Sequence, residues 1–226
     1  MVELVVRQIC FRIGAAVPDA VPVGPFRLGD AAAEALSELL QVLACGEESA
    51  ALAFAHFGCS PLEDAARRGL ARVAEEELIH ERLLRRLRAA LPPPAPDREL
   101  RRALLRFYHG IAQADIGLHL ASIAARDSAV CVILAALLEP DRVLPREPAV
   151  ATIFRRIQRD EAGHVRLSRR LVAELVRGNA LLTVAENARL GLVGLLERRG
   201  AAFESLGVDA ERLFARIARA PDGLFR

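Results

Sequence analysis

The fold is decided by two similar stretches of sequence, AEEELIH at residues 74–80 and RDEAGH at residues 159–164. In each stretch a glutamate precedes a histidine by three residues, and the pairs are Glu77 with His80 and Glu161 with His164. Residues three apart lie one turn along the same face of an α-helix, so both side chains of a pair can reach one metal ion. Chance gives about 0.4 such pairs in a chain of this composition. Two pairs therefore suggest a metal site, and the residues around them must decide whether such a site can form.

Both pairs lie within helical patterns. An aspartate at residue 30 and a leucine series at Leu36, Leu40 and Leu43 predict a first long helix over about 30–57. Ser60 is expected to cap the second helix, which ends near residue 91 before a run of prolines. Further helices are predicted over about 97–110, 112–139, 148–177, 181–199 and 208–219. The chain is therefore predicted to be all-α, with the two pairs on the second and fourth long helices.

The length of the chain fits one bundle with appended segments. With 226 residues, 53% of them hydrophobic, it can bury a sizeable core. Residues 1–29 are interpreted as an N-terminal arm, in which residues 2–6 have the pattern of a short strand. Residues 30–177 are interpreted as the helical bundle, and residues 178–226 as a C-terminal helical extension packed on it.

Composition argues against several classes of protein. The net charge of +2, with basic and acidic residues interspersed, predicts no binding to nucleic acid or to an anionic membrane. Charged residues interrupt the apolar N-terminal stretch, which argues against a signal peptide or a membrane span. The four cysteines lie far apart without a C-x-x-C pair, and they are Cys10, Cys45, Cys59 and Cys131. They are predicted to be thiols, which favours a reducing compartment and a cytoplasmic location.

The first long helix offers a third ligand. A metal site in the core of a four-helix bundle takes a glutamate from each of two helices and a Glu-x-x-His pair from each of the other two. Glu47 and Glu48 both lie at the height of Glu77. Glu47 is preferred because it continues the inward leucine series, whereas Glu48 lies about 100° further round the helix.

The third long helix offers the fourth carboxylate. Asp127 lies about as far before the turn at 140–147 as Glu161 lies after it, whereas Asp115 is roughly 15 Å too far along the bundle. Residues 92–110 would carry the chain back along the bundle, as a crossover helix between two parallel helices. Four carboxylates can neutralise two Fe(II) or Mn(II) ions, and each imidazole adds a neutral ligand. The predicted metal ligands are Glu47, Glu77, His80, Asp127, Glu161 and His164, of which the four carboxylates are also the predicted catalytic residues.

This pattern resembles the ferritin-like di-iron carboxylate superfamily, which includes ferritins, rubrerythrins, the ribonucleotide reductase small subunit, acyl carrier desaturases and N-oxygenases. The resemblance covers about 30–177 and includes the motif at residues 46–50, with an aromatic residue, Phe54, seven residues after Glu47. It implies a ferritin-like four-helix bundle. The departure is Asp127, where the family usually has glutamate; its shorter side chain leaves open whether it is a true ligand.

The resemblance also implies roles for two neighbouring carboxylates. Asp160 would accept a hydrogen bond from Nδ1 of His80, which would fix the tautomer of that ring. Glu76 would do the same for His164.

By the same resemblance, the expected activity is that of a di-iron, or Mn/Fe, oxidase or oxygenase. It would activate O2 to oxidise a small organic substrate, with an unknown electron donor and two Fe ions (Mn is left open). The only tyrosine, Tyr108, is about 19 residues from Asp127 in sequence and is expected to be too remote to act beside the metals. A ferroxidase or metal-storage protein, and a metal-free helical interaction module, remain alternatives, and a homodimer is left open.

Overall fold

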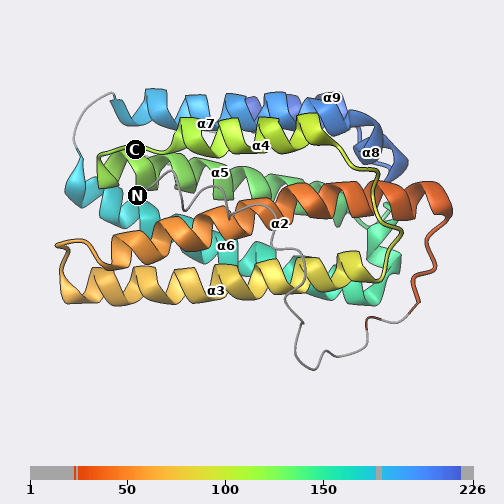
Figure 1. Cartoon of the computed structure of the whole chain (residues 1–226), viewed down its shortest axis with the longest axis horizontal. Coiled ribbons are helices and arrows are strands. Elements are labelled where there is room, and N and C mark those ends of the chain that lie inside the picture. The colour runs from red at the N-terminus through yellow and green to blue at the C-terminus, as the bar shows by residue number, and fades with distance from the viewer. Residues whose placement is uncertain (1–22, 24, 177–179, 220–226) are drawn as a thin grey trace.

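The computed structural model describes residues 23, 25–176 and 180–219, and these residues are all-helical (Figure 1). The all-α prediction is confirmed for them, and the strand predicted over residues 2–6 lies outside the described residues. The helices are α2 (Asp30–Gly58), α3 (Asp64–Ala89), α4 (Arg98–Ile111), α5 (Ile116–Leu137), α6 (Pro148–Leu175), α7 (Ala180–Leu196), α8 (Gly200–Ser205) and α9 (Ala210–Ala218). Two 3₁₀ turns are η1 (Leu144–Arg146) and η2 (Glu197–Arg199).

Two helix starts differ from the prediction. Ser60 does not cap α3, because its amide donates to the carbonyl of Phe57 at 2.9 Å and so belongs to the turn that closes α2. The α3 helix begins three residues further on, after Glu63. The α5 helix begins at Ile116 instead of near 112, because the carboxylate of Asp115 accepts from the amide of Leu118 at 2.9 Å. Only α5 begins at a polar side-chain cap; Glu63 makes no side-chain capping hydrogen bond at the start of α3.

The long helices lie along the longest axis of the molecule (Figure 1). Packing pairs α2 with α3 and α5 with α6, and α3 also contacts α6. The α4 helix leads the chain back along the molecule after α3, so that α3 and α5 run in the same direction. The α7 helix packs on α4 and α5, α9 packs on α5 and α7, and α8 covers part of α2. Of the appended helices, α7 and α9 therefore cover the outer side of α5.

Buried apolar side chains form two main layers along the four long helices. One layer takes Leu36, Leu40 and Leu43 from α2 and continues into α3, α5 and α6 with residues such as Leu84 and Phe154. The other layer lies toward the opposite end of α2 and is formed by residues such as Phe54, Phe57, Leu70, Leu120 and Val172. On each helix, the predicted ligands fall between the residues of the two layers. The polar centre is thus enclosed by hydrocarbon along the axis of the molecule.

The α5 helix is the one described helix that is long and apolar enough to span a membrane. However, 78% of its apolar window is buried among the other helices. A core helix of a soluble protein has this property, and the position of α5 between α6 and α7 accounts for its composition.

The cysteine prediction is wrong in part. Cys45 is disulfide-bonded, whereas Cys59 and Cys131 are free thiols and Cys59 is exposed. The prediction of a reducing compartment, which rested on four free thiols, is therefore weakened.

A half-buried histidine on α5, His119, leads to a prediction about acid stability. The ring of His119 packs edge-on against Phe57, with 5.0 Å between ring centroids. Burial, together with the charges of His56 and Arg126, lowers the pKa of His119 from 6.5 to about 4. Between these two pH values the unfolded chain binds a proton at His119 and the folded chain does not, so the free energy of unfolding falls as the pH falls.

His119→Gln is therefore expected to lose less stability than the wild type between pH 6.5 and about 4. Urea unfolding at a series of pH values measures this difference. The matched control is His109→Gln, since His109 is exposed at the end of α4. Equal pH slopes in His119→Gln and the wild type would contradict the assignment.

Candidate metal centre

The four long helices each bring acidic side chains to the middle of the bundle. The structure places all six predicted ligands there, each between 0% and 3% exposed: Glu47 from α2, Glu77 and His80 from α3, Asp127 from α5, and Glu161 and His164 from α6. Glu48 is only half-buried and lies outside this cluster. The choice of Glu47 over Glu48 thus agrees with the burial of the two side chains.

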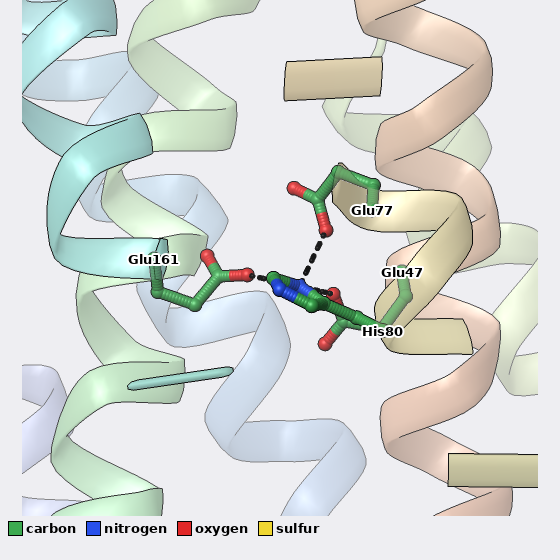
Figure 2. Close-up of side chains that lie close together, drawn as sticks. All are labelled: Glu47, Glu77, His80 and Glu161. Carbon is green, nitrogen blue, oxygen red and sulfur yellow. Dashed lines mark hydrogen bonds and ion pairs between the residues drawn. The ribbon is translucent and has the colours of Figure 1, made fainter. Parts of the chain in front are cut away.

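The first group of ligand atoms surrounds Nδ1 of His80 (Figure 2). This nitrogen lies 3.3 Å from Oε2 of Glu47, 3.6 Å from Oε2 of Glu77 and 3.5 Å from Oε1 of Glu161. One ligand atom from each of these four residues lies within 4.8 Å of the others. Such a spacing suits one metal ion among them, and we call this group the His80 position.

The second group surrounds Nδ1 of His164. This nitrogen lies 3.3 Å from Oε1 of Glu77 and 3.6 Å from Oε1 of Glu161. With Asp127, these residues again offer four ligand atoms within 4.8 Å of one another, and we call this group the His164 position. Glu77 and Glu161 belong to both positions. The arrangement therefore has two overlapping ligand sets joined by two shared carboxylates.

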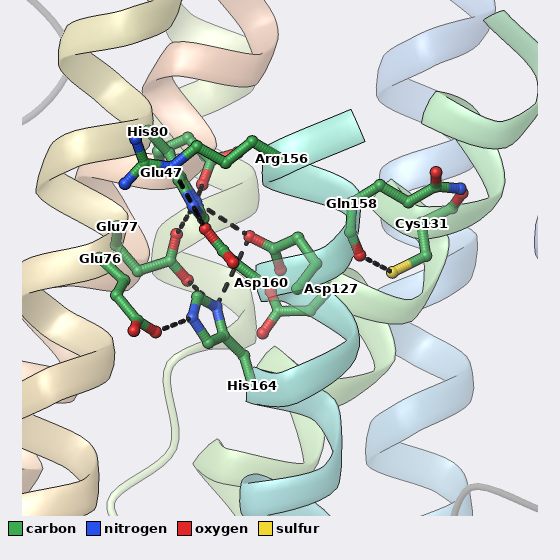
Figure 3. A network of polar contacts seen from close by, with 12 residues as sticks. Glu47, Glu76, Glu77, His80, Asp127, Cys131, Arg156, Gln158, Asp160 and His164 are labelled. Atoms are coloured by element: carbon green, nitrogen blue, oxygen red, sulfur yellow. Dashed lines mark hydrogen bonds and ion pairs between the residues drawn. The ribbon is translucent and has the colours of Figure 1, made fainter. Parts of the chain in front are cut away.

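The other nitrogen of each imidazole faces a carboxylate at the edge of the cluster (Figure 3). Nε2 of His80 lies 3.1 Å from Oδ2 of Asp160, and Nε2 of His164 lies 3.0 Å from Oε2 of Glu76. The predicted partners are thus in contact, but the predicted ring nitrogen of His80 is wrong. Nδ1 is the nitrogen nearer the backbone and faces the cluster, while Nε2 at the far end of the ring reaches across to the neighbouring helix.

These outer carboxylates lead to a prediction about metal affinity. With Nδ1 facing a metal ion, Nε2 carries the proton and donates to Asp160 or Glu76, which holds the ring in place. Asp160→Asn is expected to lower affinity for Mn(II) by about 10- to 100-fold. Equilibrium dialysis measures this change. Glu75→Gln, an exposed position on the same helix as Glu76, is the control; an equal loss in the control would contradict the role of Asp160.

A buried arginine that sequence reasoning missed stands beside the cluster. Arg126 is 3% exposed, and its Nε donates to Oδ1 of Asp127 at 2.9 Å. Its Nη1 donates to the carbonyl of Gly46 at 2.8 Å, and its Nη2 lies 3.9 Å from Oε1 of Glu77. In the sequence, Arg126 is one of many arginines and precedes Asp127, so its immediate neighbours do not distinguish it from a surface residue. Only a charged residue within the apolar pattern of 116–137 could have signalled it.

Tyr108 also lies closer to the centre than its distance along the chain predicted. The α4 helix runs back beside α2, and the hydroxyl of Tyr108 lies 2.9 Å from the place where a Cβ at Gly46 would stand. Glycine at this position leaves room for the hydroxyl of Tyr108. Burial raises the pKa of Tyr108 to about 12, and Arg126 and Glu47 are among the charges that act on it. The prediction that Tyr108 is remote is therefore wrong.

The metal-free cluster has strongly shifted protonation. Burial alone would lower the pKa of His164, but the carboxylates of Glu161 and Glu77 raise it to about 11. Burial raises the pKa of Asp127 to about 8, despite the opposing charge of Arg126. These shifts keep protons on the cluster at neutral pH. A metal ion has to displace protons from such ligands, so metal binding here releases them to solvent.

Unpartnered polar atoms test whether the residues fit a metal. Among the described residues, both carboxylate oxygens of Glu77 and of Glu161, Oδ2 of Asp127 and Nδ1 of His164 are buried without a hydrogen-bond partner. Buried polar atoms are normally paired, and unpaired buried charge is costly. Hard oxygen donors with two imidazoles suit a divalent first-row ion. The donor set thus fits a metal ion well.

Known proteins give no direct identification of the centre. A scan against protein-family models, a search of curated proteins and a search of solved structures each gave no match. The assignment therefore depends on the geometry of the buried carboxylates and imidazoles, and the family resemblance remains a proposal.

Proposed function

We propose that the chain is a ferritin-like four-helix bundle, with α4 as its crossover helix, that binds two Fe(II) or Mn(II) ions and oxidises a small organic substrate with O2. The observation that carries the proposal is the pair of overlapping ligand sets that share Glu77 and Glu161. Shared carboxylates allow two ions to act together. When bound, the metal ions supply the redox chemistry that reduces O2, which protein side chains alone lack.

The protein's own residues position and insulate the centre. Asp160 and Glu76 orient the two imidazoles from outside, and the carboxylates supply negative charge from all four helices. The two apolar layers keep bulk water from the carboxylates along the axis of the bundle. Low polarity around the centre strengthens the attraction between these carboxylates and a divalent ion.

A cavity beside α5 is the place that we propose for the organic substrate. It has a volume of about 250 Å³ and lies between α4, α5 and α7, where Phe107, Ser122 and Asn187 are among its lining residues. Ser122 precedes Arg126 by one turn of α5. The cavity combines apolar and polar side chains, as binding sites for small molecules do. Its size suits a small ligand.

Metal counting at equilibrium tests the proposal. Equilibrium dialysis against saturating Fe(II) without oxygen is expected to give two iron ions per chain. Admission of O2 to the loaded protein, followed by oxygen-electrode measurement with added reductant, then tests for turnover. Oxygen use that stops once the added Fe(II) is oxidised would indicate a ferroxidase instead. Failure to bind either Fe(II) or Mn(II) would contradict the proposal and leave a helical interaction module.

A further inference from the structure

We propose that Arg126 makes the two metal positions unequal, so that the His80 position holds a divalent cation tightly and the His164 position holds its cation far more weakly. The inference rests on the proposed function, because it concerns the same centre. It assigns to Arg126 a role in selecting how many ions the centre holds and in which order they bind.

Arg126 is fixed in place by contacts to three helices. On its own helix it binds Oδ1 of Asp127 through both Nε and Nη2. It donates to the carbonyl of Gly46 on α2 at 2.8 Å, and its Nη2 lies 3.9 Å from Oε1 of Glu77 on α3. With 3% of its surface exposed, the side chain has no short path to solvent. The guanidinium is therefore a resident cation of the cluster.

The guanidinium acts mainly on the His164 position. Oε1 of Glu77, the oxygen near Arg126, is also the oxygen that faces Nδ1 of His164 at 3.3 Å. The other oxygen of Glu77 faces His80. Asp127, which belongs only to the His164 position, has Oδ1 occupied by Arg126. A metal ion at the His164 position would thus compete with the guanidinium for Asp127 and Glu77. Glu47 and Oε2 of Glu77 remain available to an ion at the His80 position.

The charge of Arg126 and its hold on one oxygen of Asp127 predict the size of the difference in affinity. Two of the three carboxylates of the His164 position, Asp127 and Glu77, already face the positive charge of Arg126. Less negative charge therefore remains for a divalent ion, and the two cations repel each other. Oδ2 of Asp127 is buried without a hydrogen-bond partner among the described residues and stays available as a single ligand atom. The His164 position is therefore weakened and not abolished. We expect its affinity to be at least about 100-fold lower than that of the His80 position.

Unequal affinities would impose an order of loading. At low metal concentration the chain would carry one ion at the His80 position, and the second position would fill only when the concentration rises. The two positions could then hold two different ions, because the second is open for exchange while the first is not.

Mn(II) titration tests the inference directly. Electron paramagnetic resonance of free Mn(II), with equilibrium dialysis, gives the affinity of each step in the wild type, Arg126→Gln and Arg126→Lys. In the wild type we expect one tight and one weak binding step. In Arg126→Gln the two Mn(II) affinities are expected to differ by less than about tenfold. In Arg126→Lys, which keeps the positive charge, they are expected to differ as much as in the wild type. Two equal steps in the wild type, an unchanged gap in Arg126→Gln, or equal narrowing in Arg126→Lys would overturn the role of the charge.

Single histidine variants show which position binds Mn(II) tightly, even when Arg126→Gln does not fold. His80→Ala is expected to remove the tight step, and His164→Ala to leave it within about threefold of the wild type. The reverse result would overturn the inference. Absence of Mn(II) binding in the folded wild type would instead refute the proposed metal centre, so the two failures are distinguishable. Circular dichroism of each variant confirms that it is helical.

Discussion

Glu161→Gln is expected to abolish tight metal binding at both positions in a single step. Glu161 is 1% exposed and belongs to both ligand sets, so its replacement removes a charged ligand from each. Glutamine has almost the same volume, so the packing of α6 is retained while the negative charge is lost. We expect affinity for Mn(II) to fall by more than about 100-fold in each step, measured by equilibrium dialysis.

Two matched variants show whether the carboxylates are shared as the structure implies. Glu47 belongs to the His80 position alone and Asp127 to the His164 position alone. Glu47→Gln should therefore weaken the tight step and Asp127→Asn the weak one, each without the combined loss expected for Glu161→Gln. A Glu161→Gln protein that still binds two ions with wild-type affinity would show that the overlapping arrangement is wrong.

Phe54→Ala is expected to be the most destabilising single change among the residues that support the centre. The side chain is fully buried, and its ring packs edge-on against Phe57 at 6.4 Å and against the imidazole of His164 at 6.3 Å between centroids. Truncation of a buried phenylalanine costs about 3–5 kcal/mol. That is a large part of the roughly 5–15 kcal/mol by which domains are usually stable. Urea unfolding of the metal-free protein measures the loss.

The same substitution should also reach the metal centre. Loss of the Phe54 ring leaves a cavity beside His164, so the imidazole is less firmly held. Leu52→Ala, at a position 38% exposed on the same helix, is the control and should cost below about 1 kcal/mol. A loss in Phe54→Ala no larger than that in the control would contradict the packing described for this layer.

Local patterns predicted the helices and the clustering of the six acidic and imidazole side chains. Both depend on the periodicity of a helix and on the position of a residue along it. The inward leucine series at Leu36, Leu40 and Leu43 placed Glu47 on the buried face of α2, and counting from the turn before α6 selected Asp127 on α5. Spacing of three residues aligned the histidines with their glutamates. Each of these inferences needed only the geometry of one helix or of two adjacent helices.

The missed features depend on contacts between distant segments. Arg126 acquires its role because α5 brings it against Gly46, and Tyr108 approaches the centre because α4 runs back beside α2. No local pattern records such approaches. The ring nitrogen of His80 that faces the cluster depends on how closely α3 and α6 approach. Ser60 was misassigned because the turn that closes α2 continues through its amide, so that α3 begins only at Asp64.

The polar band between the two apolar layers has a consequence for how the metal-free chain opens. Buried carboxylates at mid-length whose oxygens have no hydrogen-bond partner among the described residues, such as Glu77 and Glu161, gain from hydration, whereas the apolar layers on either side lose by it. Amide hydrogen exchange is therefore expected to be fastest, among the buried turns of α3 and α6, at the middle of each helix. Bound metal would link the carboxylates at mid-length, so that the two apolar layers unfold together as one cooperative unit instead of separately.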